Sequence, residues 1–316
     1  MKQKRILSVQ DISCFGKCSS TVALPVLSAA DVETVILPTA LLSTHTGGFE
    51  NFTFLDLTEE MGRILSHWKS LGMQFDMIYA GYFGSAEQLT LVEEYLTPLL
   101  SPGGTVLVDP VMGDRGQLYS IYDGAFVDAM RDFCRRADLI TPNVTEACLL
   151  SGVPYAGDSY RPDYMEAILA GLGRVGCGAA AVTGVHFGEE QIGVVYRDFR
   201  RGERATLAAP RSDAPLHGTG DVFASALAAF LLGGFPVRQA LARTVSFVSD
   251  CIRDTEDDLE GHWYGLKFEG RLSMITDGVR EIRFAEALRR EREAEADELG
   301  SRAPAGEHGE AKDTAP

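Results

Sequence analysis

Four consecutive residues have the clearest chemical potential: Gly218, Thr219, Gly220 and Asp221 stand directly before an apolar stretch with helical character. Small residues at a helix start let backbone amides approach an anion closely, and the helix dipole adds about half a positive charge there. A carboxylate at such a place would repel a bound phosphate, but it can act as general base for a hydroxyl that attacks that phosphate. An N-cap aspartate after a glycine-rich turn explains these residues equally well.

Two further segments place polar residues at the ends of expected strands. Asp109 follows the apolar run 105–108, and Asn143 and Glu146 follow the short run 139–140. In open α/β sheets, ligands bind at the carboxyl edge of the strands. Asp109 and Glu146 are oxygen ligands of the kind that Mg²⁺ takes beside nucleotide phosphates, although Asn143 and Glu146 also have the spacing of a capping box. The three segments together indicate phosphoryl transfer.

The string CFGKCSS at residues 14–20 looks like the end of a P-loop. The first glycine of that motif would stand five residues before Gly16, but Asp11 occupies that position. Lys17 is followed by Cys18 where the motif has serine or threonine. We therefore exclude a Walker A motif.

Strand-like and helix-like segments alternate along most of the chain, which predicts βαβ crossovers with helices on both faces of a mainly parallel sheet. Residues 190–209 break this rhythm with two β-like runs around a charged turn, which predicts an antiparallel edge hairpin. The expected fold is a single-domain, three-layer α/β/α architecture. Strands are expected at 5–10, 32–37, 76–80, 105–108, 139–140 and 179–183, and helices at 20–30, 58–71, 86–100, 123–136, 143–151, 163–175, 219–233 and 236–252.

Composition limits the partners and the compartment. Among 316 residues, 29 lysines and arginines face 45 acids, for a net charge of −16, which argues against nucleic acid or an anionic membrane as the main partner. No signal peptide or run of 18 apolar residues is found, and the six cysteines are irregularly spaced, which favours reduced thiols and a cytoplasmic protein. We expect one folded domain over 1–284 and a charged helix with a disordered end over 285–316.

Five strings in the chain resemble those of the ribokinase-like superfamily, and specifically the pyridoxal/pyridoxamine (vitamin B6) kinases. The resemblance extends from about residue 4 to about 275, most of the chain. The more general strings are GTGD at 218–221, DPVMGD at 109–114 and TPNVTEA at 141–147. The more specific ones are STHTGGF at 43–49 and AGYFGSAEQ at 80–88.

This resemblance implies a ribokinase-like fold, a homodimer, and small-molecule substrates, namely ATP and a B6 vitamer whose 5′-hydroxyl receives the γ-phosphate. It also implies Mg²⁺ and often a monovalent cation, K⁺ or Na⁺. An aromatic face such as that of Tyr82 packs well against a flat ring, although a half-buried tyrosine at a strand end is the competing interpretation. By motif position, the base would be Asp221, the anion hole Gly218, Thr219 and Gly220, the magnesium and phosphate residues Asp109 and Glu146, the ATP-binding residues Asn143, Thr183 and Gly220, and the vitamin-binding residues Thr46 and Tyr82.

One substrate-side position departs from the pyridoxal kinase pattern. Those kinases commonly have Ile-Gln-Ser at the end of the first strand, with the serine at the pyridine ring, whereas this chain has Val-Gln-Asp with Asp11. Hydroxymethylpyrimidine kinases of thiamin synthesis are more similar here, but the cysteine that they often carry in the anion hole is missing from the GTGD string. A hydroxymethylpyrimidine or sugar kinase, and a non-catalytic B6-binding protein, are therefore the alternatives. The aspartate after the glycine turn weighs against the last, since a binding protein needs no base.

Overall fold

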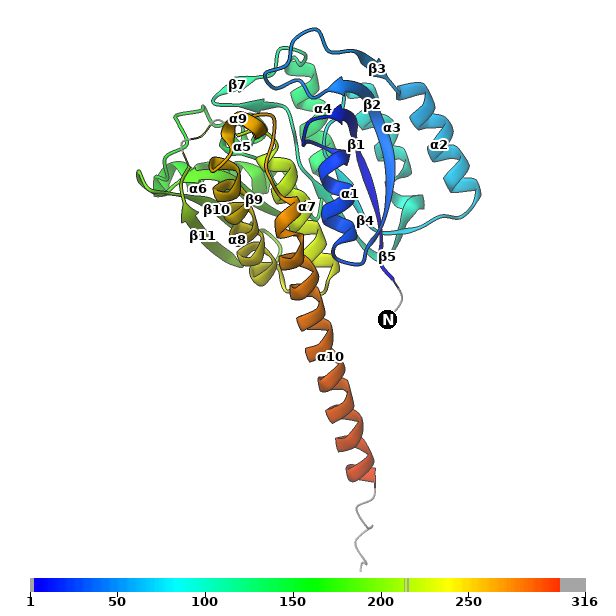
Figure 1. Cartoon of the computed structure of the whole chain (residues 1–316). Coiled ribbons are helices and arrows are strands. Elements are labelled where there is room, and N and C mark those ends of the chain that lie inside the picture. The colour runs from blue at the N-terminus through cyan, green and yellow to red at the C-terminus, as the bar shows by residue number, and fades with distance from the viewer. Residues whose placement is uncertain (1–2, 213, 215, 302–316) are drawn as a thin grey trace, which may run out of the picture.

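A nine-stranded sheet with helices on both faces forms the body of the protein (Figure 1). The computed structural model describes residues 3–212, 214 and 216–301. The strands are ordered β11-β10-β9-β8-β5-β4-β1-β2-β3. The six that pair in parallel are β1 (Arg5–Phe15), β2 (Glu33–Thr44), β4 (Phe75–Ala80), β5 (Leu100–Val108), β8 (Leu139–Ile140) and β9 (Ala179–His186).

Both edges of the sheet are antiparallel. At one edge, β10 (Gln191–Asp198) pairs with β9 and with β11 (Arg204–Pro210), which confirms the predicted hairpin. At the other edge, the short strand β3 (Phe54–Asp56) pairs with β2. All three β3 residues are exposed, so they show no apolar alternation, and the sequence analysis missed this strand. A separate two-stranded ribbon joins β6 (Gly113–Asp114) to β7 (Gln117–Leu118).

The helices form two layers around the sheet, which confirms the three-layer prediction. Their apolar faces and the sheet make two clusters of buried side chains, one on each face. Because the central strands are covered on both sides, they read as continuous apolar runs. One layer holds α2 (Thr58–Ser70), α3 (Ala86–Leu99), α4 (Gly124–Cys134), α5 (Val144–Ser151) and α6 (Pro162–Val175), and the other holds α1 (Ser20–Ser28), α7 (Thr219–Leu232), α8 (Val237–Glu256) and the start of α10 (Leu272–Ser301).

Helix α7 lies in the middle of its layer, between α1 and α8. Every residue from Val222 to Phe230 is buried, and a helix that is apolar all round is typical of a protein core. This burial on all sides holds the start of α7 in a defined place at the carboxyl edge of the sheet.

Helix α10 begins in the body and then projects from it (Figure 1). Ile275 and Val279 are buried, whereas Phe284 is 67% exposed. The helix expected over 285–300 is thus the continuation of one that starts at Leu272, and the division at residue 284 stays a prediction. The disordered end was expected over 301–316; Ser301 is the last residue of α10, and 302–316 lie outside the described residues. Within the described part of the chain, none of the helices meets the length and apolarity needed to cross a bilayer.

Candidate active site

The carboxyl ends of neighbouring strands bring most of the candidate side chains to one edge of the sheet. Tyr82 follows β4, Asp109 directly follows β5, and Asn143 follows β8. Asp11 lies on β1 beyond Val9, where the pairing of β1 with β4 ends. The start of α7, with Asp221 in its first turn, meets this same edge.

The first turn of α7 has the geometry expected of an anion hole. Gly218 is its N-cap with a positive φ of 76° and makes no side-chain cap. A Cβ on Gly218 would stand 2.2 Å from the carbonyl oxygen of Lys17, so only glycine fits there. The amides of the first helical turn have no partner within the helix, and the amides of Thr219 and Gly220 are therefore available to an anion.

Asp109 and Asp221 are carboxyl groups with shifted acidities. Asp109 is 5% exposed, and the Thr141 hydroxyl donates a 3.2 Å hydrogen bond to its Oδ1. Burial, with the neighbouring charge of Asp221, raises the pKa of Asp109. Burial likewise raises the pKa of Asp221 to about 7, although a hydrogen bond from the Ser19 amide opposes the shift. A base whose pKa lies near the operating pH is the most effective one.

Asn143 and Glu146 form the capping box at the start of α5. The Asn143 Oδ1 accepts from the Glu146 amide at 2.9 Å, and the Glu146 Oε2 accepts from the Asn143 amide at 2.9 Å. The other Glu146 oxygen accepts from the Met112 amide at 3.1 Å. Burial, then the charge of Asp109, raises the pKa of Glu146. Glu146 therefore anchors the loop after β5 to α5, and a role on the metal stays a prediction.

Thr183 and Asn143, the two residues expected near the nucleotide, lie side by side. The two residues form a parallel β-bridge, and the Thr183 amide donates to the Pro142 carbonyl at 2.9 Å. The side-chain nitrogen of Asn143, Nδ2, donates to the Gly113 carbonyl at 2.8 Å. The structure brings these two residues together, and their part in binding ATP stays a prediction.

Two of the expected vitamin-binding residues, Asp11 and Tyr82, lie at the ends of neighbouring strands, and the third, Thr46, lies on a loop. Asp11 is 5% exposed and accepts a 2.8 Å hydrogen bond from Ser13, and burial raises its pKa. Burial, with the charge of Asp11, raises the pKa of Tyr82 to about 12, and both residues follow the point where the pairing of β1 with β4 ends. Thr46 is exposed on the loop after β2, where the Gly47 amide donates to His45 Nδ1 at 3.1 Å.

The sequence analysis missed the turn between β1 and α1, which contacts the candidate base. The Ser19 amide and the Cys18 thiol both hydrogen-bond to Asp221. Ser19 holds a φ of 51°, which is uncommon for any residue except glycine. The Gly-Lys-Cys-Ser string excluded as a P-loop is the signal that could have found this turn, because it places small residues before a helix.

The buried carboxyl groups predict that the unliganded protein loses stability as pH rises. Asp109, Glu146 and Asp221 have higher pKa values in the fold than in the unfolded chain, so the native state binds more protons above the unfolded value. Their contribution is complete below about pH 4 and is lost as the pH passes the native values, which for Asp221 is about 7. We expect the Tm at about pH 8 to be at least about 2 °C below that at about pH 5.5. Calorimetry would measure this, and a Tm that rises over that interval in wild type and Asp221→Asn alike would contradict it.

Comparison with known proteins agrees with this geometry. The sequence profile of the phosphomethylpyrimidine kinase family matches residues 24–264. A relative in Actinobacillus pleuropneumoniae, pyridoxal kinase PdxY, is 27% identical over 267 residues, which cover 80% of this chain and 89% of that protein.

Two solved structures are more similar in sequence. Pyridoxal kinase from Lactobacillus plantarum is 35% identical with a TM-score of 0.79, over 86% of this chain and 96% of that one. A protein from Bacteroides thetaiotaomicron, provisionally named a phosphomethylpyrimidine kinase and crystallised with pyridoxal, is 34% identical with a TM-score of 0.82, over 87% and 96% of the two chains.

Proposed function

The chain belongs to the phosphomethylpyrimidine kinase family and has the ribokinase-like fold, and from this premise we propose that it phosphorylates a B6 vitamer with ATP. It is an ATP-dependent kinase whose acceptor is the 5′-hydroxyl of pyridoxal, pyridoxine or pyridoxamine. The main observation behind this acceptor is the similarity over nearly the whole length of the Lactobacillus plantarum pyridoxal kinase. The arrangement of Asp221, Asp109 and the start of α7 supports the same reaction.

In this proposal Asp221 accepts the proton of the attacking hydroxyl. As the hydroxyl oxygen forms its bond to the γ-phosphorus, the bond from that phosphorus to the bridging oxygen breaks, and ADP leaves with the electron pair. The pKa of Asp221, raised by burial to about 7, leaves a large fraction of the group ionised and basic at neutral pH. Support for this role comes from its place in the first turn of α7, beside the anion hole.

The amides of Thr219 and Gly220 would hold the phosphoryl oxygens. Stabilisation by fixed backbone donors is effective because the donors need no reorganisation as charge develops. A Cβ on Gly220 would lie 3.8 Å from Asp109 Oδ2, so the missing side chain leaves room between the helix start and that carboxylate. An acidic chain can therefore bind ATP without a basic surface.

The burial and the oxygen atoms of Asp109 suit a carboxylate that binds Mg²⁺. Asp109 is buried, one of its oxygens accepts a hydrogen bond from Thr141, and the other faces Gly220. Mg²⁺ beside nucleotide phosphates usually takes one or two carboxylates together with phosphate oxygens. When bound, the magnesium ion would neutralise negative charge on the phosphates. Asp109 would hold it, and Glu146 would support that loop through its bonds to Met112 and Asn143.

On the acceptor side, Tyr82 and Asp11 would contact the ring of the vitamer. Tyr82 is partly buried and lies near Tyr122, with 6.5 Å between ring centroids. Asp11 offers a carboxyl group that a ring nitrogen could meet. Thr46 would contribute from the loop after β2. We include in the proposal, on the strength of the family resemblance, a monovalent cation (K⁺ or Na⁺), a homodimer and a cytoplasmic location.

Hydroxymethylpyrimidine is the second candidate acceptor, because Asp11 stands where the pyridoxal kinase pattern has serine. A panel of pyridoxal, pyridoxine, pyridoxamine, hydroxymethylpyrimidine and ribose, each with Mg-ATP, tests the choice. We expect the highest kcat/KM with a B6 vitamer, and at least about 10-fold below it with the pyrimidine, because the ring contacts differ by one or more hydrogen bonds. ADP release in a coupled assay gives the rates.

Three results of the panel would lead to different conclusions. A preference for the pyrimidine would replace the proposed acceptor, and Asp11→Ser should then shift selectivity toward the vitamers. A preference for ribose would reject both ring substrates. Tight vitamer binding by calorimetry without turnover of ATP would favour a non-catalytic binding protein.

A further inference from the structure

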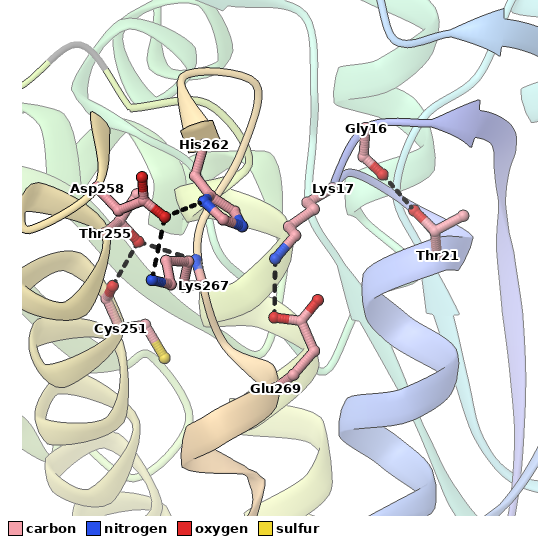
Figure 2. A network of polar contacts seen from close by, with 9 residues as sticks. All are labelled: Gly16, Lys17, Thr21, Cys251, Thr255, Asp258, His262, Lys267 and Glu269. Carbon is pink, nitrogen blue, oxygen red and sulfur yellow. Dashed lines mark hydrogen bonds and ion pairs between the residues drawn. The ribbon is translucent and has the colours of Figure 1, made fainter. Parts of the chain in front are cut away.

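A segment that follows α8 crosses the molecule to the turn between β1 and α1. We name residues 257–271 the strap; it contains the short helix α9 (Leu259–His262) and the 3-10 turn η1 (Glu269–Arg271). Figure 2 shows its contacts with α8 on one side and with Lys17 on the other. None of these contacts was foreseen from the sequence, because the partners are far apart along the chain.

The strap is firmly attached to the end of α8. The Lys267 amide donates to the Thr255 hydroxyl at 2.8 Å, and that hydroxyl donates to the Cys251 carbonyl at 2.6 Å. Within the strap itself, Asp258 accepts from His262 Nδ1 at 2.9 Å and from Lys267 Nζ at 3.4 Å. The strap can therefore act as a fixed support for the turn between β1 and α1, which it contacts on its other side.

Lys17 is one of the residues that the strap contacts, and the strap also packs against Phe15, His45 and Phe49. Its ammonium group lies 2.8 Å from Glu269 Oε2 and 5.4 Å from the centre of the Phe268 ring. The Lys17 side chain is only 14% exposed, and a Cβ on Gly265 would stand 2.5 Å from the Lys17 Cβ. The lysine stem is thus packed against Gly265 and Phe268 of the strap, and its ammonium group meets the more exposed carboxylate of Glu269.

The main chain of the same residue contacts the proposed anion hole. The Lys17 carbonyl oxygen is the atom that a Cβ on Gly218 would meet at 2.2 Å. The next two residues, Cys18 and Ser19, hydrogen-bond to Asp221. Lys17 therefore joins the strap, through its side chain, to the turn that holds the proposed base and anion hole.

We propose that Lys17 is a positioning residue for phosphoryl transfer, whose ion pair with Glu269 uses the strap to hold residues 16–20 against Gly218 and Asp221. This inference rests on the proposed function. It predicts that the ion pair acts on the chemical step, because the turn contacts the base and the anion hole. A displacement of about 1 Å at a site removed from the chemistry can cost about 100-fold in rate, so a measurable loss of kcat is expected.

The test uses four variants of the full chain: Lys17→Met, Glu269→Gln, both together, and the reversed pair Lys17→Glu with Glu269→Lys. We expect each single variant to lower kcat by about 10-fold to 100-fold, with the KM for the vitamer changed less than about two-fold, since positioning of the base differs from ground-state binding. The double variant should be no slower than the slower single one. The reversed pair should recover most of the lost kcat.

Lys4→Met is the matched control. It removes an ion pair of similar length, Lys4 to Asp76 at 2.7 Å, at the opposite end of β1 from Lys17. Because the Lys4 side chain is 50% exposed and that of Lys17 only 14%, we expect Lys4→Met to leave kcat unchanged and to lower the Tm no more than Lys17→Met does. Glu269 is 57% exposed, so Glu269→Gln should fold even if Lys17→Met does not.

Unchanged kcat in Glu269→Gln, multiplicative losses in the double variant, or no recovery in the reversed pair would each overturn the inference. The Asp221→Asn variant distinguishes a failure of this inference from a failure of the proposed function. If Asp221→Asn loses turnover while Glu269→Gln keeps it, only the role of Lys17 is wrong. If Asp221→Asn turns over like wild type, the base assignment itself is wrong.

Discussion

Asp221→Asn is expected to lower kcat by ~10²–10⁴-fold, the usual contribution of a general base. The substitution keeps the size and the hydrogen-bonding oxygen of the side chain but removes its basicity. The hydrogen bond from the Ser19 amide can be retained by the asparagine oxygen. The loss should therefore appear in turnover, while the affinity for ADP, measured by calorimetry, stays near that of wild type.

The fold should tolerate this change well. Burial raises the pKa of Asp221, which means that its charged form destabilises the native state relative to the unfolded chain. Replacing it by a neutral group should leave the Tm at about pH 8 equal to or above that of wild type. A fall in turnover accompanied by a large fall in Tm would instead point to misfolding.

Asp123→Asn is the matched control for Asp221→Asn. Asp123 is the N-cap of α4 and accepts from the Phe126 amide at 2.9 Å, and asparagine is an equally good N-cap. If Asp221 were only a helix-start aspartate, both variants would behave alike and keep their activity. The structure places the N-cap at Gly218 rather than Asp221, so wild-type turnover in Asp221→Asn would favour a purely structural carboxyl group in the first turn of α7 over the base.

Gly218→Ala is the second variant with a large expected effect. Its Cβ would lie 2.2 Å from the Lys17 carbonyl oxygen and 3.5 Å from Cys18 Sγ, so the start of α7 must move away from the turn between β1 and α1. Loss of a single fixed donor to a developing charge costs about 10²–10³-fold in turnover. We expect a loss of at least about 100-fold with weaker ADP binding.

Gly202→Ala separates this close approach from backbone strain. Gly202 has a similar positive φ of 73°, but nothing lies within 4 Å of its Cβ position. Both alanines suffer the strain of the left-handed region, about 1–2 kcal/mol, and only Gly218→Ala adds the contact with Lys17. Steady-state kinetics and thermal unfolding compare the two variants. Equal effects on turnover would show that the contact at Gly218 has no functional weight.

The order of elements could be predicted from the sequence because it depends on local patterns. The segment 58–71, predicted as a helix from its periodicity, becomes α2 (Thr58–Ser70) apart from its last residue, and the two β-like runs around Arg200–Gly202 become the hairpin of β10 and β11. The edge strand β3 could not be predicted, since its three exposed residues are ordered by pairing with β2. Likewise, β1 continues to Phe15 because β2 lies beside it, where the sequence analysis ended the strand at residue 10.

The candidate site divides in the same way. Asp109, Asn143 and Asp221 were found because each stands next to a local signal, a strand end or a glycine turn. Thr141 was part of a noted string, but its hydrogen bond to Asp109 joins residues 32 positions apart. The capping box at Asn143 and Glu146 had a local spacing that could not tell it from a metal site, and the hydrogen bonds of Glu146 show which contacts it makes.

The alternation of strands and helices, the glycine turn before Asp221 and the acidic character of the chain can be read from the sequence, because they depend on neighbouring residues and on composition. The shift of the Asp221 pKa to about 7 by burial and the link that Lys17 makes between the strap and Gly218 depend on how the folded chain packs. Burial and such contacts arise when segments as far apart as Lys17 and Glu269, 252 positions along the chain, pack together. No periodicity or motif within either segment encodes that approach.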